Sequence, residues 1–238
     1  MEEMRLQKYV SDCGLMSRRA AEKEIEQGHF KINGTIAKIG DKVNPDTDTV
    51  EYKGKTIKGG DKKVYVMLYK PRGYVTTMND EEGRKCIPEL LKDIPQRVYP
   101  CGRLDMDSEG LLILTNDGEV ANKLMHPKHH VEKIYHVKVK GEIEPEKLMT
   151  LNSPMIIDDY KIKPVKVTII ERKEGNTILK FALSEGRNRQ IRKMCENCNL
   201  TITRLKRVAV GDLTIGMLKP GQWKFMNYNE ISILKNMS

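Results

Sequence analysis

The chain has no run of about 18 apolar residues, the length that a helix needs to cross a membrane. Its first five residues are acidic and then amphipathic, unlike the basic and then apolar order of a secretory signal. The cysteines are odd in number and scattered, which favours reduced thiols over a disulfide framework. They are Cys13, Cys86, Cys101, Cys195 and Cys198. These absences predict a cytoplasmic protein without a membrane partner.

Convincing metal and cofactor motifs are also missing. Only Cys195 and Cys198 form a C-x-x-C pair, and the nearest histidines provide no second pair for a structural zinc site. A calcium loop counted from Asp105 would need Glu at its twelfth position, where Asn116 stands. The sequence contains no glycine-rich phosphate loop. We therefore expect neither a metal nor a cofactor.

Positive charge is abundant. Lys and Arg number 42 against 33 Asp and Glu, which gives a formal net charge of +9 and a pI near 9.2. Such a chain attracts polyanions, of which nucleic acid is the commonest, although charge alone leaves open a basic protein with no specific partner. The length of 238 residues allows a small domain followed by a larger one.

The first sixty residues have the pattern of a small basic domain. Apolar spacing predicts helices over residues 4–13 and 18–27, the second with Ser17 as its N-cap. The dipeptide Asn33-Gly34 predicts a hairpin over residues 30–39. Two cations in the first turn of the second helix oppose its dipole, and a bound phosphate would relieve that conflict, though a merely solvated face stays open. The basic side chains of this domain are Arg5, Lys8, Arg18, Arg19, Lys23, Lys31 and Lys38.

Beyond a Gly- and Lys-rich stretch at residues 53–63, read as the edge of the small domain and a flexible connection, strands and helices alternate. Period-two and continuous apolar runs mark the strand candidates, and a 3.6-residue period marks the helices. The strands are expected at 64–68, 111–115, 134–139, 165–170 and 178–183, and the helices at 119–125, 144–151 and 187–197. This order predicts one α+β domain with a mixed sheet.

Two polar clusters could carry chemistry. Residues 102–110 bring three carboxylates before an apolar strand, and a loop that only turns the chain is the alternative. Residues 187–194 form a helix dense in cations, which must face solvent, phosphate or carboxylate because unpaired burial is costly. An arginine that points inward needs an anion, and Asp105 suits it because a guanidinium keeps a carboxylate ionised.

Motifs along the whole chain resemble two known families. Residues 4–11, 14–22, 25–28, 31–34 and 40–43 resemble an S4 domain, a small RNA-binding module of two helices and a hairpin. The segments 70–73, 102–105, 108–118, 133–137, 185–194 and 205–211 resemble, in order and spacing, the Rsu-type pseudouridine synthases. The resemblance implies an α+β fold with an S4 domain at residues 1–60. A catalytic domain with a mixed, mainly antiparallel sheet flanked by helices would follow at residues 61–238.

The same resemblance implies an enzyme that converts a uridine of ribosomal RNA to pseudouridine without a cofactor, after the base has left its stack. Asp105 would attack the target nucleotide, by addition to the sugar or by promoting elimination. Tyr135 would stack on the uracil, Arg192 would pair with Asp105, and Leu205 would line the pocket. The RNA-binding set in the catalytic domain would shape the site or touch RNA, and consists of Lys70, Arg103, Arg187, Asn188 and Gln190. RNA contacts are also implied in the S4 domain for Arg5, Lys8, Arg18, Arg19, Lys23, Lys31 and Asn33.

Several alternatives stay open at this point. The region 124–135 resembles the members that modify large-subunit RNA more closely than those that modify small-subunit RNA. A non-catalytic, ribosome-associated S4 protein would need no reactive acid. A glycosidase that uses Asp105 would release free uracil. The chain is expected to act as a monomer, with ribosomal RNA or an assembly intermediate as its partner.

Overall fold

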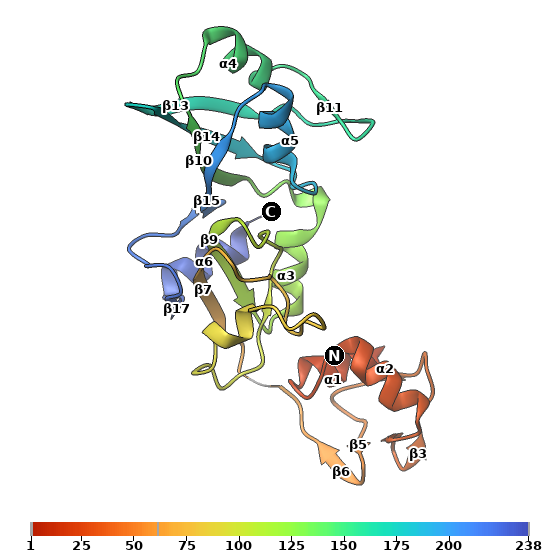
Figure 1. Ribbon diagram of the computed structural model, residues 1–238. Helices are drawn as coiled ribbons and strands as arrows, with labels where there is room; N and C mark the ends of the chain where they lie inside the picture. The colour runs from red at the N-terminus through yellow and green to blue at the C-terminus, as the bar shows by residue number, and fades with distance from the viewer. Residues whose placement is uncertain (1, 61, 238) are drawn as a thin grey trace. The chain divides into compact units, whose positions relative to one another are not determined.

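Two units with separate hydrophobic cores make up the chain (Figure 1). The computed structural model describes residues 2–60 and 62–237. One unit runs to Val64 and includes Ile94–Val98 and Asn116–Gly118, and the other contains the rest. Among the described residues, no helix combines the length and hydropathy needed to span a bilayer.

The first unit has the two helices that the apolar spacing predicts. Helix α1 spans Leu6–Asp12, later in its start than expected because residues 4–5 form a short strand. Helix α2 spans Arg18–Glu26, and the hydroxyl of Ser17 accepts a hydrogen bond from the amide of Ala20 at 3.1 Å. Leu6, Val10, Ala21, Ile25 and Phe30 are among the buried residues of the core beneath them.

Two small sheets complete this unit. Strands β2 and β3 form the predicted hairpin, with Asn33 and Gly34 at φ values of 50° and 83° in its turn. Residues 55–57 form an edge strand, as expected for the end of the small domain. The four-stranded sheet has the order β3-β2-β5-β6, and β1 pairs with β4. The strands are β1 (Met4–Arg5), β2 (Phe30–Ile32), β3 (Thr35–Ile36), β4 (Lys42–Val43), β5 (Val50–Tyr52) and β6 (Lys55–Ile57).

A mixed sheet organises the second unit. Its strand order is β13-β14-β10-β15-β9-β7-β17, and β15 and β9 pair in parallel while the other neighbours are antiparallel. This confirms the predicted α+β fold with a mainly antiparallel sheet. The strands are β7 (Tyr65–Lys70), β8 (Tyr99–Pro100), β9 (Glu109–Thr115), β10 (Lys133–Lys140), β11 (Ile156–Ile157), β12 (Tyr160–Lys161), β13 (Lys166–Lys173), β14 (Asn176–Leu183), β15 (Ile202–Val210), β16 (Leu213–Thr214) and β17 (Trp223–Phe225).

Helices flank this sheet and close two apolar cores. Helices α4 (Pro145–Asn152) and α5 (Gln190–Asn197) pack on the face of β10 and β14 that carries Val137 and Phe181. Helices α3 (Gly118–Met125) and α6 (Tyr228–Asn236) pack with β7 and β9 in the second core. The turns η1 (Ile87–Leu90) and η2 (Pro127–His129) are single 3₁₀ segments. Helix α5 begins three residues later than predicted because Arg189 adopts a left-handed conformation at φ 51°.

A close backbone approach joins the middle of the sheet. Gly110 lies opposite Arg207 where β9 and β15 run parallel, and its φ is +116°. A Cβ atom there would come within 2.7 Å of the Arg207 nitrogen and 2.9 Å of its carbonyl carbon. Only glycine fits both the conformation and the contact. This pairing places the loop before β9 beside the side chains of β15.

Candidate active site

A cavity of about 490 Å³ opens in the second unit beside the N-terminal end of α5. Its lining comes from the loop before β9, from β10 and β15, and from residues 186–192. The structure brings into it eight of the residues that the sequence singled out. They are Arg103, Asp105, Tyr135, Arg187, Asn188, Gln190, Arg192 and Leu205. The volume is within the range of about 300–1,000 Å³ that holds small ligands or a nucleobase with its sugar.

Hydrogen bonds to its backbone hold the loop that carries Asp105. The hydroxyl of buried Thr76 donates to the Leu104 carbonyl at 2.6 Å and accepts from the Leu104 amide at 3.2 Å. The Gly73 amide donates to the Met106 carbonyl at 2.7 Å. With its neighbours fixed in this way, Asp105 keeps a side chain that is 38% exposed and lines the cavity. The carboxylate is therefore both positioned and accessible.

Lys70 does not line the cavity but lies directly behind this loop. Its side chain is fully buried, and its ammonium donates to the carbonyls of Pro71 and Ser108 at 2.9 Å each. Burial lowers the pKa of Lys70 to about 8, against the opposing effect of the nearby Asp105 and Asp107 carboxylates. Lys70 thus links the end of β7 to the loop before β9, as expected for a residue that shapes the site, and its full burial leaves no surface for a contact with RNA.

The arginines of residues 187–192 pair with two carboxylates, and one predicted pair is wrong. The guanidinium of Arg192 lies 3.1 Å from the Asp107 carboxylate and donates to the Ser108 hydroxyl at 3.2 Å. The cation nearest Asp105 is Arg189, at 3.8 Å, and Arg189 also contacts Asp107 at 3.4 Å. Arg189 is the left-handed residue before α5, and its side chain faces the loop. Arg192 lies about one turn further along, where it meets Asp107 instead of Asp105.

Tyr135 and Leu205 contribute apolar surface from adjacent strands. Tyr135 on β10 is half-buried and lies opposite Arg207 of β15, while Leu205 of β15 is buried and lies opposite Val137. Both side chains lie on the sheet face that packs against α5 and line the cavity. An aromatic ring and an aliphatic side chain on one face suit a flat base with polar edges.

Several donors at the cavity lack partners among the described residues. Gln190 is 3% exposed, and its side-chain nitrogen has no hydrogen-bond acceptor there, although its oxygen accepts from the Arg187 amide. The Nε of Arg192 is likewise buried without an acceptor. Lys133 also lines the cavity, and burial together with Arg207 lowers its pKa to about 8. Unsatisfied buried donors are costly, so these groups are suited to a ligand rich in acceptors.

Four contributors to the site escaped the sequence reasoning. Arg189 and Asp107 form the ion pairs described above, Lys133 lines the cavity, and Arg207 is 4% exposed. Arg207 donates to the carbonyls of Leu111 at 2.7 Å and Arg103 at 3.3 Å. Asp107 stood in the polar cluster of residues 102–110 and the other three inside recognised motifs, but which of these residues touch one another depends on strand register and helix phase, which the motifs do not encode.

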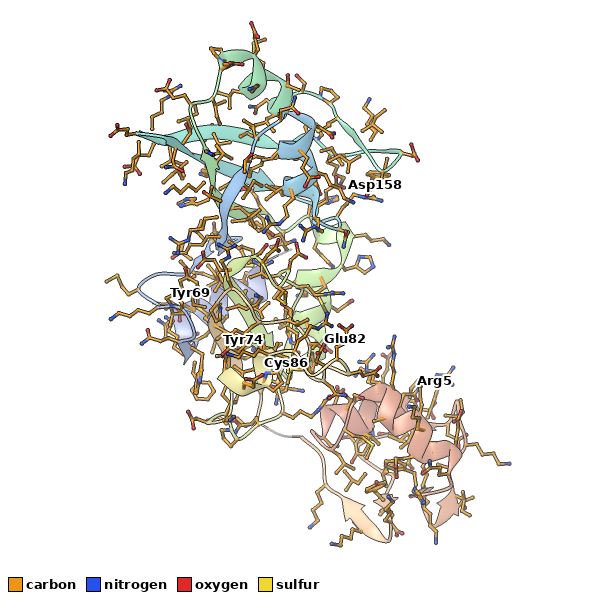
Figure 2. All side chains as sticks on the ribbon, in the orientation of Figure 1. Arg5, Tyr69, Tyr74, Glu82, Cys86 and Asp158 are labelled. Carbon is orange, nitrogen blue, oxygen red and sulfur yellow. The ribbon has the colours of Figure 1, made fainter. Side chains whose placement is uncertain are left out.

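A hairpin of β11 and β12 adjoins residues 187–193. The guanidinium of Arg187 stacks on the ring of Tyr160 at 3.5 Å, and Lys193 pairs with Asp158 at the tip of the hairpin (Figure 2). The pairing of Lys193 agrees with the expectation that these cations face solvent, phosphate or carboxylate, whereas the stacking of Arg187 on an aromatic ring was not expected.

The residues of the first unit that are expected to contact RNA fall into two groups. Arg5 donates to the Gly40 carbonyl, and Lys8 pairs with Asp12 at 2.9 Å. The side chain of Asn33 donates to the Asp48 carboxylate through its nitrogen and accepts from the backbone amide of Thr49 through its oxygen. The second group is exposed and forms no ion pair within the described part of the chain. It consists of Arg18, Arg19, Lys23 and Lys31. This second group is free to contact a polyanion.

Comparison with known proteins identifies relatives of both units. A family model described as RNA pseudouridylate synthase matches residues 64–197, and an S4 domain model matches residues 4–48. The chain is 41% identical over 236 residues to an uncharacterized RNA pseudouridine synthase of Aquifex aeolicus, covering 98% of this chain and 94% of that one. It is 39% identical over 237 residues to ribosomal large subunit pseudouridine synthase B of Bacillus subtilis, covering 98% and 96%.

A solved structure extends the similarity to the whole fold. The crystal structure of a pseudouridylate synthase has a TM-score of 0.69 and 28% identity to this chain, covering 97% of this chain and 99% of that one. Both parts of the sequence thus match in the same order as in full-length relatives. The chain therefore belongs to the family of RNA pseudouridine synthases and carries an S4 domain ahead of its catalytic part.

Proposed function

We propose that this enzyme converts a specific uridine of large-subunit ribosomal RNA to pseudouridine, with Asp105 as the reacting carboxylate. One observation supports the proposal above the rest. Asp105, Tyr135 and Leu205 line one cavity, although 30 residues separate the first two in sequence and 70 the last two, as their numbers give. The carboxylate, the aromatic ring and the aliphatic wall are the groups that the reaction requires.

The reaction needs no external reactant. The bond between N1 of uracil and C1′ of the ribose breaks, the base turns, and C5 bonds to C1′. A proton leaves C5 and N1 gains one, so atoms and charge balance within one nucleotide. A carboxylate can assist by attack on C1′ or by removal of a ribose proton, and both routes place Asp105 against the sugar. The target must leave its stack to reach it.

The cations around Asp105 support an RNA substrate. Arg103, Arg187 and Lys133 line the cavity together with the buried donors of Gln190 and Arg192. Phosphates flanking a flipped nucleotide provide acceptors for such groups. The S4 domain, for which we keep a boundary at residue 60, would add the exposed cations of α2 as a second set of phosphate contacts.

The large-subunit target rests on relatives. Proteins of Bacillus subtilis and Vibrio vulnificus that are 39% and 34% identical to this chain bear the name ribosomal large subunit pseudouridine synthase B. The identity extends over 98% of this chain in both comparisons, so it includes both units. A small-subunit target is the alternative that mapping of modified sites would reveal.

Asp105→Asn tests the catalytic role. We expect the rate of pseudouridine formation in transcribed large-subunit RNA to fall by at least about 1,000-fold, with RNA affinity within about threefold of the unmodified enzyme. Tritium release from C5 of labelled uridine measures the rate, and filter binding measures affinity. Free uracil in the supernatant would instead indicate a glycosidase.

Asp107→Asn is the matched control, two residues away in the same loop. It removes the partner of Arg189 and Arg192 but leaves Asp105 in place, so a reduced and measurable rate is expected. Should Asp107→Asn abolish the reaction while Asp105→Asn retains it, the assignment of the reacting acid would be wrong. If both variants are as active as the parent, neither carboxylate is the reacting group.

A further inference from the structure

The sheet of the second unit has a cationic face on the side opposite the cavity. Along β10, Tyr135 and Val137 point toward α5, so His136 and Lys138 point the other way. Lys180 of β14 and Lys206 of β15 lie directly opposite His136 on either side. We call His136, Lys138, Lys180 and Lys206 the cationic face. Helices α4 and α5 cover the other side of these strands and leave this one half-buried or exposed.

Register brings these charges into direct contact range. Neighbouring strands lie about 4.8 Å apart, so the row Lys180, His136 and Lys206 spans about 10 Å. Like charges that face each other on neighbouring strands destabilise a sheet, as Lys138 and Arg204 do on this face. Burial and the Lys206 and Lys180 cations lower the pKa of His136 between them, so the imidazole is mainly neutral near pH 7 and the charge of this row comes from the two lysines. The fold therefore tolerates an unfavourable arrangement at this place.

Carboxylates that could neutralise the row are already engaged or absent. Glu171 is the one acidic residue in the sequences of β13, β14, β10 and β15, and it pairs with Lys173 at 3.0 Å. Glu109, from β9, is bonded by Arg204 and by the hydroxyl of Tyr69, labelled in Figure 2. Lys138, Lys180 and Lys206 form no ion pair within the described residues, although Lys206 lies 4.8 Å from the Tyr69 ring centre.

We propose that the cationic face is a second RNA-binding site, which holds the phosphate backbone of the substrate at a distance from the target nucleotide. The inference rests on the proposed function only for the choice of RNA as the polyanion. Since the cavity opens on the other side of the same strands, one RNA segment enters the cavity while another passes behind the sheet. The enzyme thereby prefers a folded RNA that can reach both sides over an isolated stem-loop.

RNA suits this face better than an acidic protein surface. The side chains interleaved with the lysines, such as Ile178 and Ala182, are small or aliphatic and carry no polar group for a protein partner to bond. Cations repeated along neighbouring strands can meet successive phosphates of a backbone and require no matching pocket. Counterion release then contributes affinity that falls steeply with salt.

The test is a triple variant, Lys138→Gln, Lys180→Gln and Lys206→Gln, in the full-length chain. The matched control removes the same charge from Lys85, Lys92 and Lys219, which are exposed in the same unit but away from this face. Affinity for a fluorescein-labelled RNA duplex of 20 base pairs is measured by anisotropy between 50 and 300 mM KCl. Each phosphate contact contributes about 0.9 to the slope of log Kd against log salt. Because the face variant loses three such contacts, we expect its slope to be lower than that of the parent by about 2 to 3.

Each outcome decides the matter. The face variant should bind at least about 10-fold more weakly at 150 mM KCl, whereas the control should differ from the parent by less than about threefold. Equal slopes for the two variants, or an unchanged slope for the face variant, overturn the proposal. The proposal is also overturned if the face variant keeps the salt slope for RNA but no longer binds an acidic protein that the parent binds. A thermal unfolding curve that matches the parent shows that the face variant is folded. None of its three substitutions lies in the hydrophobic core, because all three lysines reach solvent.

This outcome is separate from that of the catalytic test. Asp105→Asn should keep the salt slope of the parent, because Asp105 does not lie on the cationic face. If Asp105→Asn remains active, the proposed role of Asp105 fails while the duplex measurement still reports on the face. If the slope does not change in the face variant, the second site fails while the assignment of Asp105 stands.

Discussion

Gly110→Ala would disrupt the joint between β9 and β15, and the cost can be worked from the geometry. The new methyl would lie 2.7 Å from the Arg207 nitrogen and 2.9 Å from its carbonyl carbon, and closer still to its carbonyl oxygen. Backbone atoms of a central strand cannot rotate away, so this overpacking costs about 1–3 kcal/mol. A φ of +116° adds about 1–3 kcal/mol for a residue with a Cβ. We expect the variant to be less stable by about 2–6 kcal/mol.

Gly175→Ala separates the two contributions. Gly175 joins β13 to β14 with a φ of +70°, but a Cβ there has no atom within 4 Å, so only the backbone cost applies. Urea unfolding followed by tryptophan fluorescence is the assay, because Trp223, the single tryptophan, reports on the unit that contains both glycines. A Gly110→Ala cost no larger than that of Gly175→Ala would refute the argument from close approach.

Other perturbations probe the loop, the buried cation and the S4 domain. Thr76→Val leaves the Leu104 amide and carbonyl without partners, and should cost about 1–3 kcal/mol in urea unfolding and lower the rate of pseudouridine formation. Burial lowers the pKa of Lys70 from 10.5 to about 8, so between these pH values the unfolded chain binds one more proton than the folded chain. The stability of the parent relative to Lys70→Met should therefore rise from pH 8 to 10.5. A stability difference that does not change with pH would contradict the burial argument. Arg18→Gln with Arg19→Gln should reduce the salt slope of RNA binding by about 2, without a change in thermal unfolding.

Local patterns were sufficient for most elements of the fold. The N-cap at Ser17, the turn at Asn33-Gly34 and the alternation along β10 depend on neighbours in sequence, and the structure confirms each of them. The strand β15 was not recognised because its residues Arg204, Lys206 and Arg207 break the apolar pattern. Two of these cations are tolerated in a central strand because distant groups bind them: the Glu109 carboxylate binds Arg204, and the Leu111 carbonyl binds Arg207.

The site was predictable as a set of residues but not as a set of contacts. Family motifs gave the members that line the cavity, and the structure places Asp105 and Tyr135 there. The partner of Arg192 was wrong because the choice between two carboxylates in one loop depends on where α5 begins. That start depends on the left-handed backbone of Arg189, a conformation that an arginine adopts only under constraint from the surrounding structure.

The cations of the site are held in two different ways, with opposite electrostatic consequences. Arg189 and Arg192 meet carboxylates, so their charges are largely neutralised within the protein. Lys70 and Arg207 are bound by backbone carbonyls, which satisfy their hydrogens but cancel little charge. Lys70 and Arg207 are themselves buried, so their excess of positive charge acts over a longer range than it would in solvent. An incoming phosphate would compensate this excess, so RNA binding would be favoured beside the loop that carries Asp105, the carboxylate that we propose as the reacting group.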